Sequence, residues 1–318
     1  MEDLLNAIYS TPIIDNHAHS LLKFEAQYKH RLLSITTEAT GEALRSVTST
    51  LSHIRAVKQL AGVLGCRDNW EDMVDAIGVK KNEDRDAWTR RCLEGIQIIL
   101  IDDSIDSTNP VHVYNWHNTF TKSKCKRIAR IEVVAEDIMK KLRLSIQNYT
   151  IENLWPHFTQ SFATTINDFI ADGEVVAFKS VISYRTGLDI PVVVNGEEVA
   201  SAYRGIFLGL LHCTPQEYQK LTRIDGTILN AYLVHEVARL ISISPNTYKH
   251  PIQFHTGLGD QDIDLAKSRP SHMQTSSKHG PKFRSSSSMQ ATHGPRRQVS
   301  LLICIIMYTR ISERCFQE

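Results

Sequence analysis

Two histidines near the amino terminus are the residues best suited to metal chemistry. His17 and His19 follow the apolar pair at positions 13–14, and Asp15 precedes them by two residues. Residues i and i+2 of a strand point to the same side, so both imidazoles are expected to project together. Two nitrogen ligands suit a borderline divalent ion such as zinc, and Asp15 could orient an imidazole as a hydrogen-bond acceptor. The alternative is a pair of histidines that merely line a loop.

His255 is the candidate for a third metal ligand. It ends the run Pro251–Phe254 and precedes a loop that contains Gly257 and Gly259. Barrel enzymes place catalytic groups at the carboxyl ends of their strands. Taken alone, such a histidine would be structural. The presence of a metal-binding pair elsewhere in the chain favours the role of ligand.

Three further polar residues are candidates for the site. Lys179 lies in the apolar run 175–182, where an unpaired charge would be costly to bury. It could pair with Glu132, carry a carboxylate that bridges two metals, or act directly at the site. Tyr184 and Arg185 follow the same run, and Arg185 could bind a substrate carboxylate through two hydrogen bonds or be a solvated loop charge. The remaining histidines considered are expected to be structural: His53, His212, His235 and His250.

Apolar runs alternate with amphipathic stretches along the chain. Strands are predicted at Ile13–His19, Ile96–Ile101, Arg127–Val134, Val175–Tyr184 and Ile252–Thr256, and helices at Ile151–Ile170 and Pro215–Ile241. Strands separated by helices indicate a parallel sheet, and a long series of such units favours a closed (β/α)₈ barrel. The long connection at about residues 20–94 is expected to hold a helical active-site insertion.

The composition excludes several classes of protein. The 318 residues carry a formal net charge of +1, with 42% hydrophobic and 22% charged residues, which gives no reason to expect nucleic acid or an anionic membrane as partner. The six cysteines form no C-x-x-C pair, and the acidic start lacks the features of a signal peptide. A cytoplasmic protein with reduced thiols is expected.

Five blocks of sequence resemble the amidohydrolase superfamily, in particular the amidohydrolase-related domain at the front of fungal FluG-type, glutamine-synthetase-like proteins. The blocks are Pro12–His19, Ile98–Asp103, Arg130–Glu136, Phe178–Leu188 and Gln253–Leu265. The resemblance implies a (β/α)₈ barrel with one or two divalent ions. His17 and His19 match the strand-one ligands, His255 the strand-five ligand, and Lys179 the position of a bridging carboxylated lysine. The strand-six histidine and the strand-eight aspartate of the superfamily cannot be placed in this chain.

The sequence changes character after Gln274. Serine clusters and Gly-Pro pairs replace the alternation of strands and helices, and no acidic residue occurs between Asp264 and Glu313. A disordered basic tail is one interpretation. A second is a change of reading frame, because the displaced codons of residues 284–294 permit a buried strand that ends in histidine. The barrel domain is therefore assigned to 1–274 and an aberrant tail to 275–318.

The expected activity is metal-dependent hydrolysis of an amide or related C–N bond in a small carboxylate-bearing molecule. A bound metal would lower the pKa of water and polarise the scissile carbonyl. Metal-dependent decarboxylation on the same scaffold is an alternative, since fold does not select the reaction. A non-catalytic remnant is another, because two superfamily ligands cannot be placed.

Overall fold

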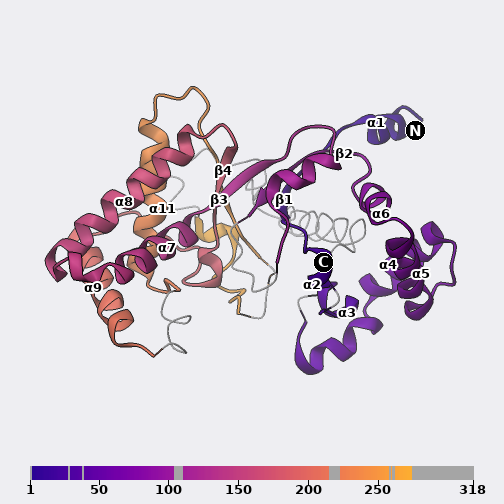
Figure 1. Ribbon diagram of the computed structural model, residues 1–318, viewed down its shortest axis with the longest axis horizontal. Coiled ribbons are helices and arrows are strands. Elements are labelled where there is room, and N and C mark those ends of the chain that lie inside the picture. Colours follow the sequence, from indigo (N-terminus) through magenta and orange to yellow (C-terminus); the bar gives the residue numbers. More distant parts are fainter. Residues whose placement is uncertain are drawn as a thin grey trace. The chain divides into compact units, whose positions relative to one another are not determined.

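The computed structural model describes residues 2–27, 29–37, 39–103, 110–214, 223–257, 259 and 262–273 (Figure 1). The chain forms two compact units, the first extending to Lys126 and the second beginning at Arg127. The predicted tail at 275–318, with its change of reading frame, lies outside the described residues, as do residues 215–222 of the helix predicted from Pro215.

The first unit is built on two parallel strands, β1 (Ile13–His19) and β2 (Ile96–Asp102), which match the predicted strands. Ile96, Ile99 and Ile101 of β2 are buried. The register is interrupted in β1, because Asp15 pairs with Ile99 whereas Ala18 pairs with Ile101. Two residues of β1 therefore stand opposite one of β2, a bulge that lies at the first predicted histidine.

The other elements of the first unit are helices. They are α1 (Glu2–Ser10), α2 (Phe24–Gln27), α3 (Leu32–Ile35), η1 (Gly41–Ser49), α4 (Leu51–Leu64), α5 (Trp70–Glu83), α6 (Arg85–Cys92) and η2 (Tyr114–Thr119). The side chains of Thr50, Asn69 and Asp84 cap α4, α5 and α6 by accepting a hydrogen bond from the backbone three residues on. Gly65 ends α4 at φ +70°, a conformation that favours glycine.

The second unit holds three parallel strands, β3 (Lys126–Arg130), β4 (Val175–Ser180) and β5 (Ile252–Phe254), with β4 in the middle. Its helices are α7 (Ile131–Leu144), η3 (Ile146–Asn148), α8 (Ile151–Ala171), η4 (Ile182–Tyr184), α9 (Gly196–His212), α11 (Thr227–Ile243) and η5 (Pro270–His272). Of these, α7, α8, α9 and α11 pack against one another (Figure 1).

A continuous apolar core joins these four helices to the strands. On α8, buried side chains recur every four residues and form one stripe: Leu154, Phe158, Phe162, Ile166 and Ile170. Phe158 lies 4.5 Å from Tyr203 of α9 between ring centroids. Phe178 of β4 belongs to the same cluster and is fully buried. The core thus fixes β4, the strand that carries Lys179.

The predicted ends of three strands were wrong. Strand β3 stops at Arg130, because the apolar residues from Ile131 onward have helical spacing and form the buried face of α7. Strand β4 stops at Ser180 and is followed by η4, and β5 stops at Phe254. Helix α9 was not predicted, although Asn195 caps its start with bonds to two backbone amides.

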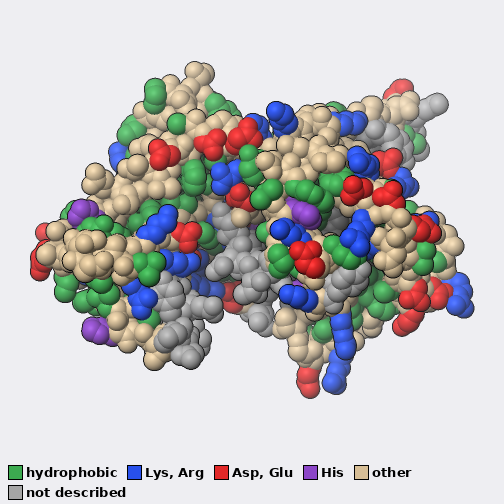
Figure 2. Space-filling model, viewed as in Figure 1, with side chains coloured by type: hydrophobic (Ala, Val, Ile, Leu, Met, Phe, Trp, Pro, Cys, Tyr) green, Lys and Arg blue, Asp and Glu red, His purple; other side chains and the backbone are tan. Residues whose placement is uncertain are grey.

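The prediction of an α/β fold with parallel strands is confirmed within each unit. In the part of the chain that the structure describes, no helix is long and apolar enough to cross a membrane. No disulfide joins the four cysteines of that part to one another. On the face shown in Figure 2, basic and acidic side chains are interspersed.

Candidate functional site

The first unit brings His17 and His19 together at the carboxyl end of β1. Their ring centroids lie 6.0 Å apart and the rings meet edge to face, at 74°. His17 is exposed and His19 partly buried, with 29% of its side chain accessible. The two imidazoles are therefore neighbours at a strand end that solvent can reach.

Asp102 holds His19 and was not predicted as a site residue. It is the register partner of His19 at the end of β2 and is only 1% exposed. The Nδ1 atom of His19 lies 3.2 Å from the Asp102 carbonyl oxygen and 3.9 Å from its Oδ2. A proton on Nδ1 would serve this contact and leave the lone pair on Nε2, as in histidines that bind metals. The signal in the sequence is a carboxylate at the end of the strand that follows.

Asp15 accepts a hydrogen bond from the backbone of His17, whereas the sequence predicted a contact with an imidazole ring. Its Oδ1 accepts a hydrogen bond from the His17 amide at 3.1 Å. Burial raises the pKa of the Asp15 carboxyl, and the bond from His17 partly offsets this effect. Asp15 thus fixes the backbone at the bulge that presents His17.

In the second unit, Lys179 is 3% exposed in the middle strand. The alternative in which it pairs with Glu132 is wrong. Glu132 instead accepts hydrogen bonds at Oε1 from the Ser180 hydroxyl, at 2.6 Å, and from the Val181 amide, at 3.1 Å. The cause is the helical conformation of α7, which begins at Ile131 and points the carboxylate to the end of β4.

Glu132 is itself an unusual group. It is 2% exposed, and its Oε2 has no hydrogen-bond partner among the described residues. Burial raises the pKa of this carboxyl, while the charge of Arg185 acts in the opposite direction. A carboxyl group in such surroundings favours its protonated form.

Tyr184 and His255 form a pair near the carboxyl end of β5. The Tyr184 hydroxyl lies 2.9 Å from His255 Nε2, and the His255 amide donates to the Ser180 carbonyl at 3.2 Å. A Cβ atom on Gly259 would overlap both Tyr184 and His255 Nε2. The glycine of the predicted loop is therefore required by close packing on this pair.

Arg185 is engaged within the protein. Its guanidinium forms an ion pair with Glu136 and donates to the Ile224 carbonyl at 3.1 Å. Glu136 also accepts from the Ile224 amide at 3.1 Å. The two side chains are only 8% and 12% exposed, so the guanidinium is not a solvated loop charge.

The predicted site residues thus form separate groups. His17, His19 and Asp15 belong to the first unit, and Lys179, Tyr184, Arg185 and His255 to the second. Within the described ranges, no three His, Cys, Asp or Glu side chains gather as a metal-binding group. The chemistry present is an imidazole pair held by Asp102 in the first unit and a buried polar network at the ends of β4 and β5 in the second.

Comparisons with known proteins place the chain beside two others. No family model matches it. It is 35% identical over 287 residues to Protein fluG of Emericella nidulans. The aligned region covers 86% of this chain and 32% of that protein. The chain therefore spans about a third of the length of this curated relative.

The structure is similar to a crystal structure of a proposed metal-dependent hydrolase from Lactobacillus casei. The TM-score is 0.67 at 21% sequence identity, and the match covers 87% of this chain and 66% of the other. At this identity the likeness shows a shared fold, which agrees with the α/β arrangement of parallel strands.

Proposed function

We propose that the chain is a metal-dependent hydrolase of the amidohydrolase type, with a (β/α)₈ barrel, that cleaves a C–N bond of a small carboxylate-bearing molecule. The observation that carries the proposal is the His17–His19 pair at the end of β1, with His19 Nδ1 held 3.2 Å from the Asp102 carbonyl. The name of the Lactobacillus casei protein and the similarity to Protein fluG support it.

The imidazole pair fits a divalent ion. Two imidazoles on one tetrahedral zinc place their ring centroids roughly 5 Å apart, given Zn–N bonds of about 2.0–2.1 Å. The 6.0 Å separation of the His17 and His19 ring centroids is close to that value. Nitrogen donors favour zinc over calcium or magnesium. We propose zinc, with His17 and His19 as its ligands in the first unit.

A bound ion would supply Lewis acidity, which lowers the pKa of water and polarises a carbonyl group. Asp102 keeps the His19 ring in one orientation. Asp15 fixes the His17 backbone. In the second unit, Tyr184 holds the His255 ring, and the ion pair of Arg185 with Glu136 stabilises the backbone that carries Tyr184.

Metal analysis of the purified full chain tests the proposal. We expect about one zinc or more per chain, and Asn substitution at His17 or His19 should remove most of it, since each change deletes a ligand. His212→Asn is the matched control, because His212 is exposed at the end of α9. A folded protein that binds no divalent ion, or that binds equally well in all three variants, would contradict the proposal.

The reaction is tested on the metal-loaded chain with a panel of N-acyl amino acids and carboxylate-bearing amides. Release of ammonia or an amine is expected. Release of carbon dioxide without amine would instead show the decarboxylase alternative, and a loaded protein inactive towards the whole panel would favour a binding role.

A further inference from the structure

The first unit contains a cavity, and part of its lining follows the proposed metal ligands directly in the sequence. It has a volume of about 270 Å³ and is lined by Leu21, Leu22, Phe24, Gln27, Lys81, Arg85, Asp86, Trp88, Thr89, His112 and Trp116. Leu21 and Leu22 come two and three residues after His19. The volume and mixed lining suit a small molecule with an apolar part and a charged part.

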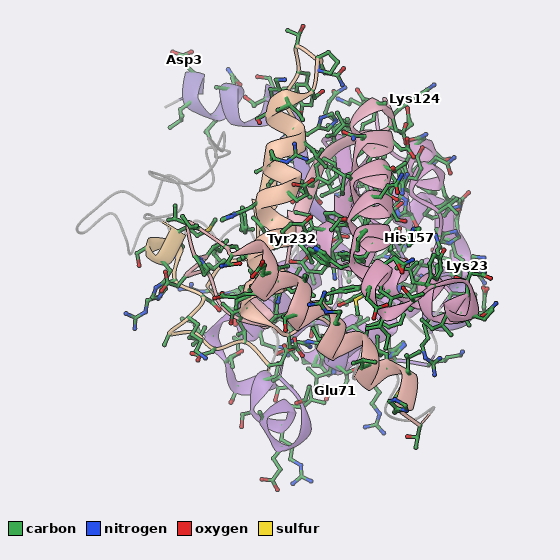
Figure 3. All side chains as sticks on the ribbon, turned by 90° about the vertical axis from the view of Figure 1, so that its left-hand side faces the viewer. Asp3, Lys23, Glu71, Lys124, His157 and Tyr232 are labelled. Carbon is green, nitrogen blue, oxygen red and sulfur yellow. The ribbon has the colours of Figure 1, made fainter. Side chains whose placement is uncertain are left out.

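One wall of the cavity is fixed by backbone bonds. Leu22 pairs with Val111 as an antiparallel bridge, and the His112 amide donates to the Leu21 carbonyl at 2.8 Å. The Leu21 amide donates to Nε2 of the buried His117 at 3.2 Å. The next residue, Lys23 (labelled in Figure 3), donates its amide to the Pro110 carbonyl at 2.9 Å. This wall is therefore formed before any ligand binds.

Flat rings contribute much of the lining. His112 and Trp116 stack at 3.7 Å between centroids with an angle of 11°. Burial is the largest cause that lowers the pKa of His112, and the charge of Lys23 adds to it, so the neutral imidazole is favoured. Trp88 of α6 and Phe24 of α2 also line the cavity. These rings offer stacking surfaces to a flat group on the ligand.

Two cations line the same cavity. Lys81 of α5 donates to Gln27 Oε1 at 3.4 Å, and Arg85 of α6 lies over the Phe24 ring. In the described part of the chain, neither side chain has an ion pair with a carboxylate. Asp86 is the one carboxylate in the lining, so the three formal charges sum to +1. Burial lowers the pKa of the Lys81 ammonium, and an incoming anion would offset this effect.

We propose that this cavity binds the carboxylate of a small molecule that also carries a flat apolar group, with Lys81 and Arg85 as its donors and the His112–Trp116 stack as its apolar wall. The binding itself requires no metal. The assignment of this ligand as substrate or product of the hydrolase rests on the proposed function.

Calorimetric titration of the full chain with phenylacetate tests the site. We expect saturable binding at one site per chain, and at least about tenfold weaker binding of phenylacetamide, which has the ring but no charge. Acetate, which lacks the ring, should also bind at least about tenfold more weakly. Equal binding of phenylacetate and phenylacetamide, or no binding of phenylacetate, would overturn the proposal.

Variants locate the site. Lys81→Gln should weaken phenylacetate binding about tenfold or more, because it removes the charge that pairs with the carboxylate. Lys80→Gln is the matched control, because Lys80 is the preceding residue of α5 and pairs with Glu83 at 3.0 Å. If the Lys80 and Lys81 variants bind alike, the cavity is not the site. Circular dichroism checks that each variant folds.

A double variant, His17→Asn with His19→Asn, separates this proposal from the hydrolase proposal. It should bind no zinc and still bind phenylacetate as the unchanged chain does. Loss of both would show that the cavity depends on the metal site and would overturn the proposal of a metal-independent site.

Discussion

At the scale of single residues, the contact between His19 and Asp102 bears most directly on the proposed metal binding. A histidine that binds a metal depends on the group that holds its other nitrogen. In β1 that group belongs to a neighbouring strand and is buried, so the ring orientation is set by the fold. The residue that positions the proposed ligand is therefore as informative as that ligand itself.

Asp102→Asn keeps the backbone carbonyl but removes the carboxylate that lies 3.9 Å from His19 Nδ1. We expect zinc affinity to fall by about 10-fold, at the lower end of the range for groups that support metal ligands. Chelator competition measures this change. Asp75→Asn, at an exposed position of α5, should leave the affinity unchanged. An unchanged affinity in the Asp102 variant would show that the carbonyl alone positions the ring.

Glu132 predicts a dependence of stability on pH. Burial, the largest cause, raises its pKa above the ordinary value of 4.5, so the folded chain ionises this group at higher pH than the unfolded chain does. Its contribution to the free energy of unfolding is therefore complete below about pH 4.5 and is lost as the pH rises through the folded-state value. Between the unfolded-state pKa and the folded-state pKa, the free energy of unfolding falls by about 1.4 kcal/mol per pH unit.

Glu132→Gln cannot ionise, so the variant should gain stability relative to the unchanged chain as the pH rises. Urea denaturation at a series of pH values from 4 upward measures the difference. Glu71→Gln, on α5 of the first unit (labelled in Figure 3), is the control at an exposed position. A difference that stays constant with pH would mean that Glu132 is ionised in the folded chain at a normal pKa.

At the scale of elements, Arg185 and Glu136 join the end of η4 to α7. Both side chains also form hydrogen bonds with the backbone of Ile224, which precedes α11. The buried ion pair therefore links η4, α7 and the segment before α11. A buried charge left without its partner is costly, whereas removal of both charges is much less so.

Arg185→Met should lower the free energy of unfolding by about 3–5 kcal/mol, because it leaves Glu136 buried and unpaired. The double variant with Glu136→Leu should recover most of this loss. Urea denaturation of both variants and a double-mutant cycle measure the coupling. If Arg185→Met leaves stability unchanged and only raises the KM of the proposed reaction, Arg185 is a substrate-binding residue, as the sequence suggested.

The starts of the elements could be predicted from sequence better than their ends. Apolar runs mark where β3 and β4 begin, but Ile131 and Ile182 are apolar on the far side of each boundary, and only packing shows that they are helical. The His17–His19 pair follows from local spacing. Asp102 could not be assigned, because its role depends on the parallel register of β1 with β2, 83 residues along the chain from His19.

Lys179 and Glu132 show the same limit in another form. Each is buried, and the sequence alone allowed them to pair. Because α7 begins at Ile131, the Glu132 carboxylate instead accepts hydrogen bonds from Ser180 and Val181. The partner of a buried polar group is decided by tertiary geometry. Composition and periodicity carry no information about that geometry.

At the scale of the whole molecule, the two units differ in how their cores are built. The second has one large cluster shared by four helices and the strands, whereas the buried residues of the first fall into smaller groups, among them Val57, Met73 and Ile77 around α4 and α5. Smaller clusters provide less apolar burial. The helical segment between β1 and β2 is therefore expected to exchange amide hydrogens faster than α8.

The last prediction concerns the coding sequence beyond residue 274. In the frame displaced by one base, Met289-Gln290 must encode alanine and Met307-Tyr308 must encode valine, whatever synonymous codons are used. The permitted codons of residues 284–294 include Val-Val-Leu-Leu-His-Ala-Ser-Tyr-Pro-Trp, whose first five residues form an apolar strand that ends in histidine. We expect the coding DNA to carry this reading without interruption, and expression in the restored frame should raise the zinc content, because a further histidine ligand becomes available. Stop codons in the displaced frame, or different residues in place of the strand, would show that the serine-rich sequence is native.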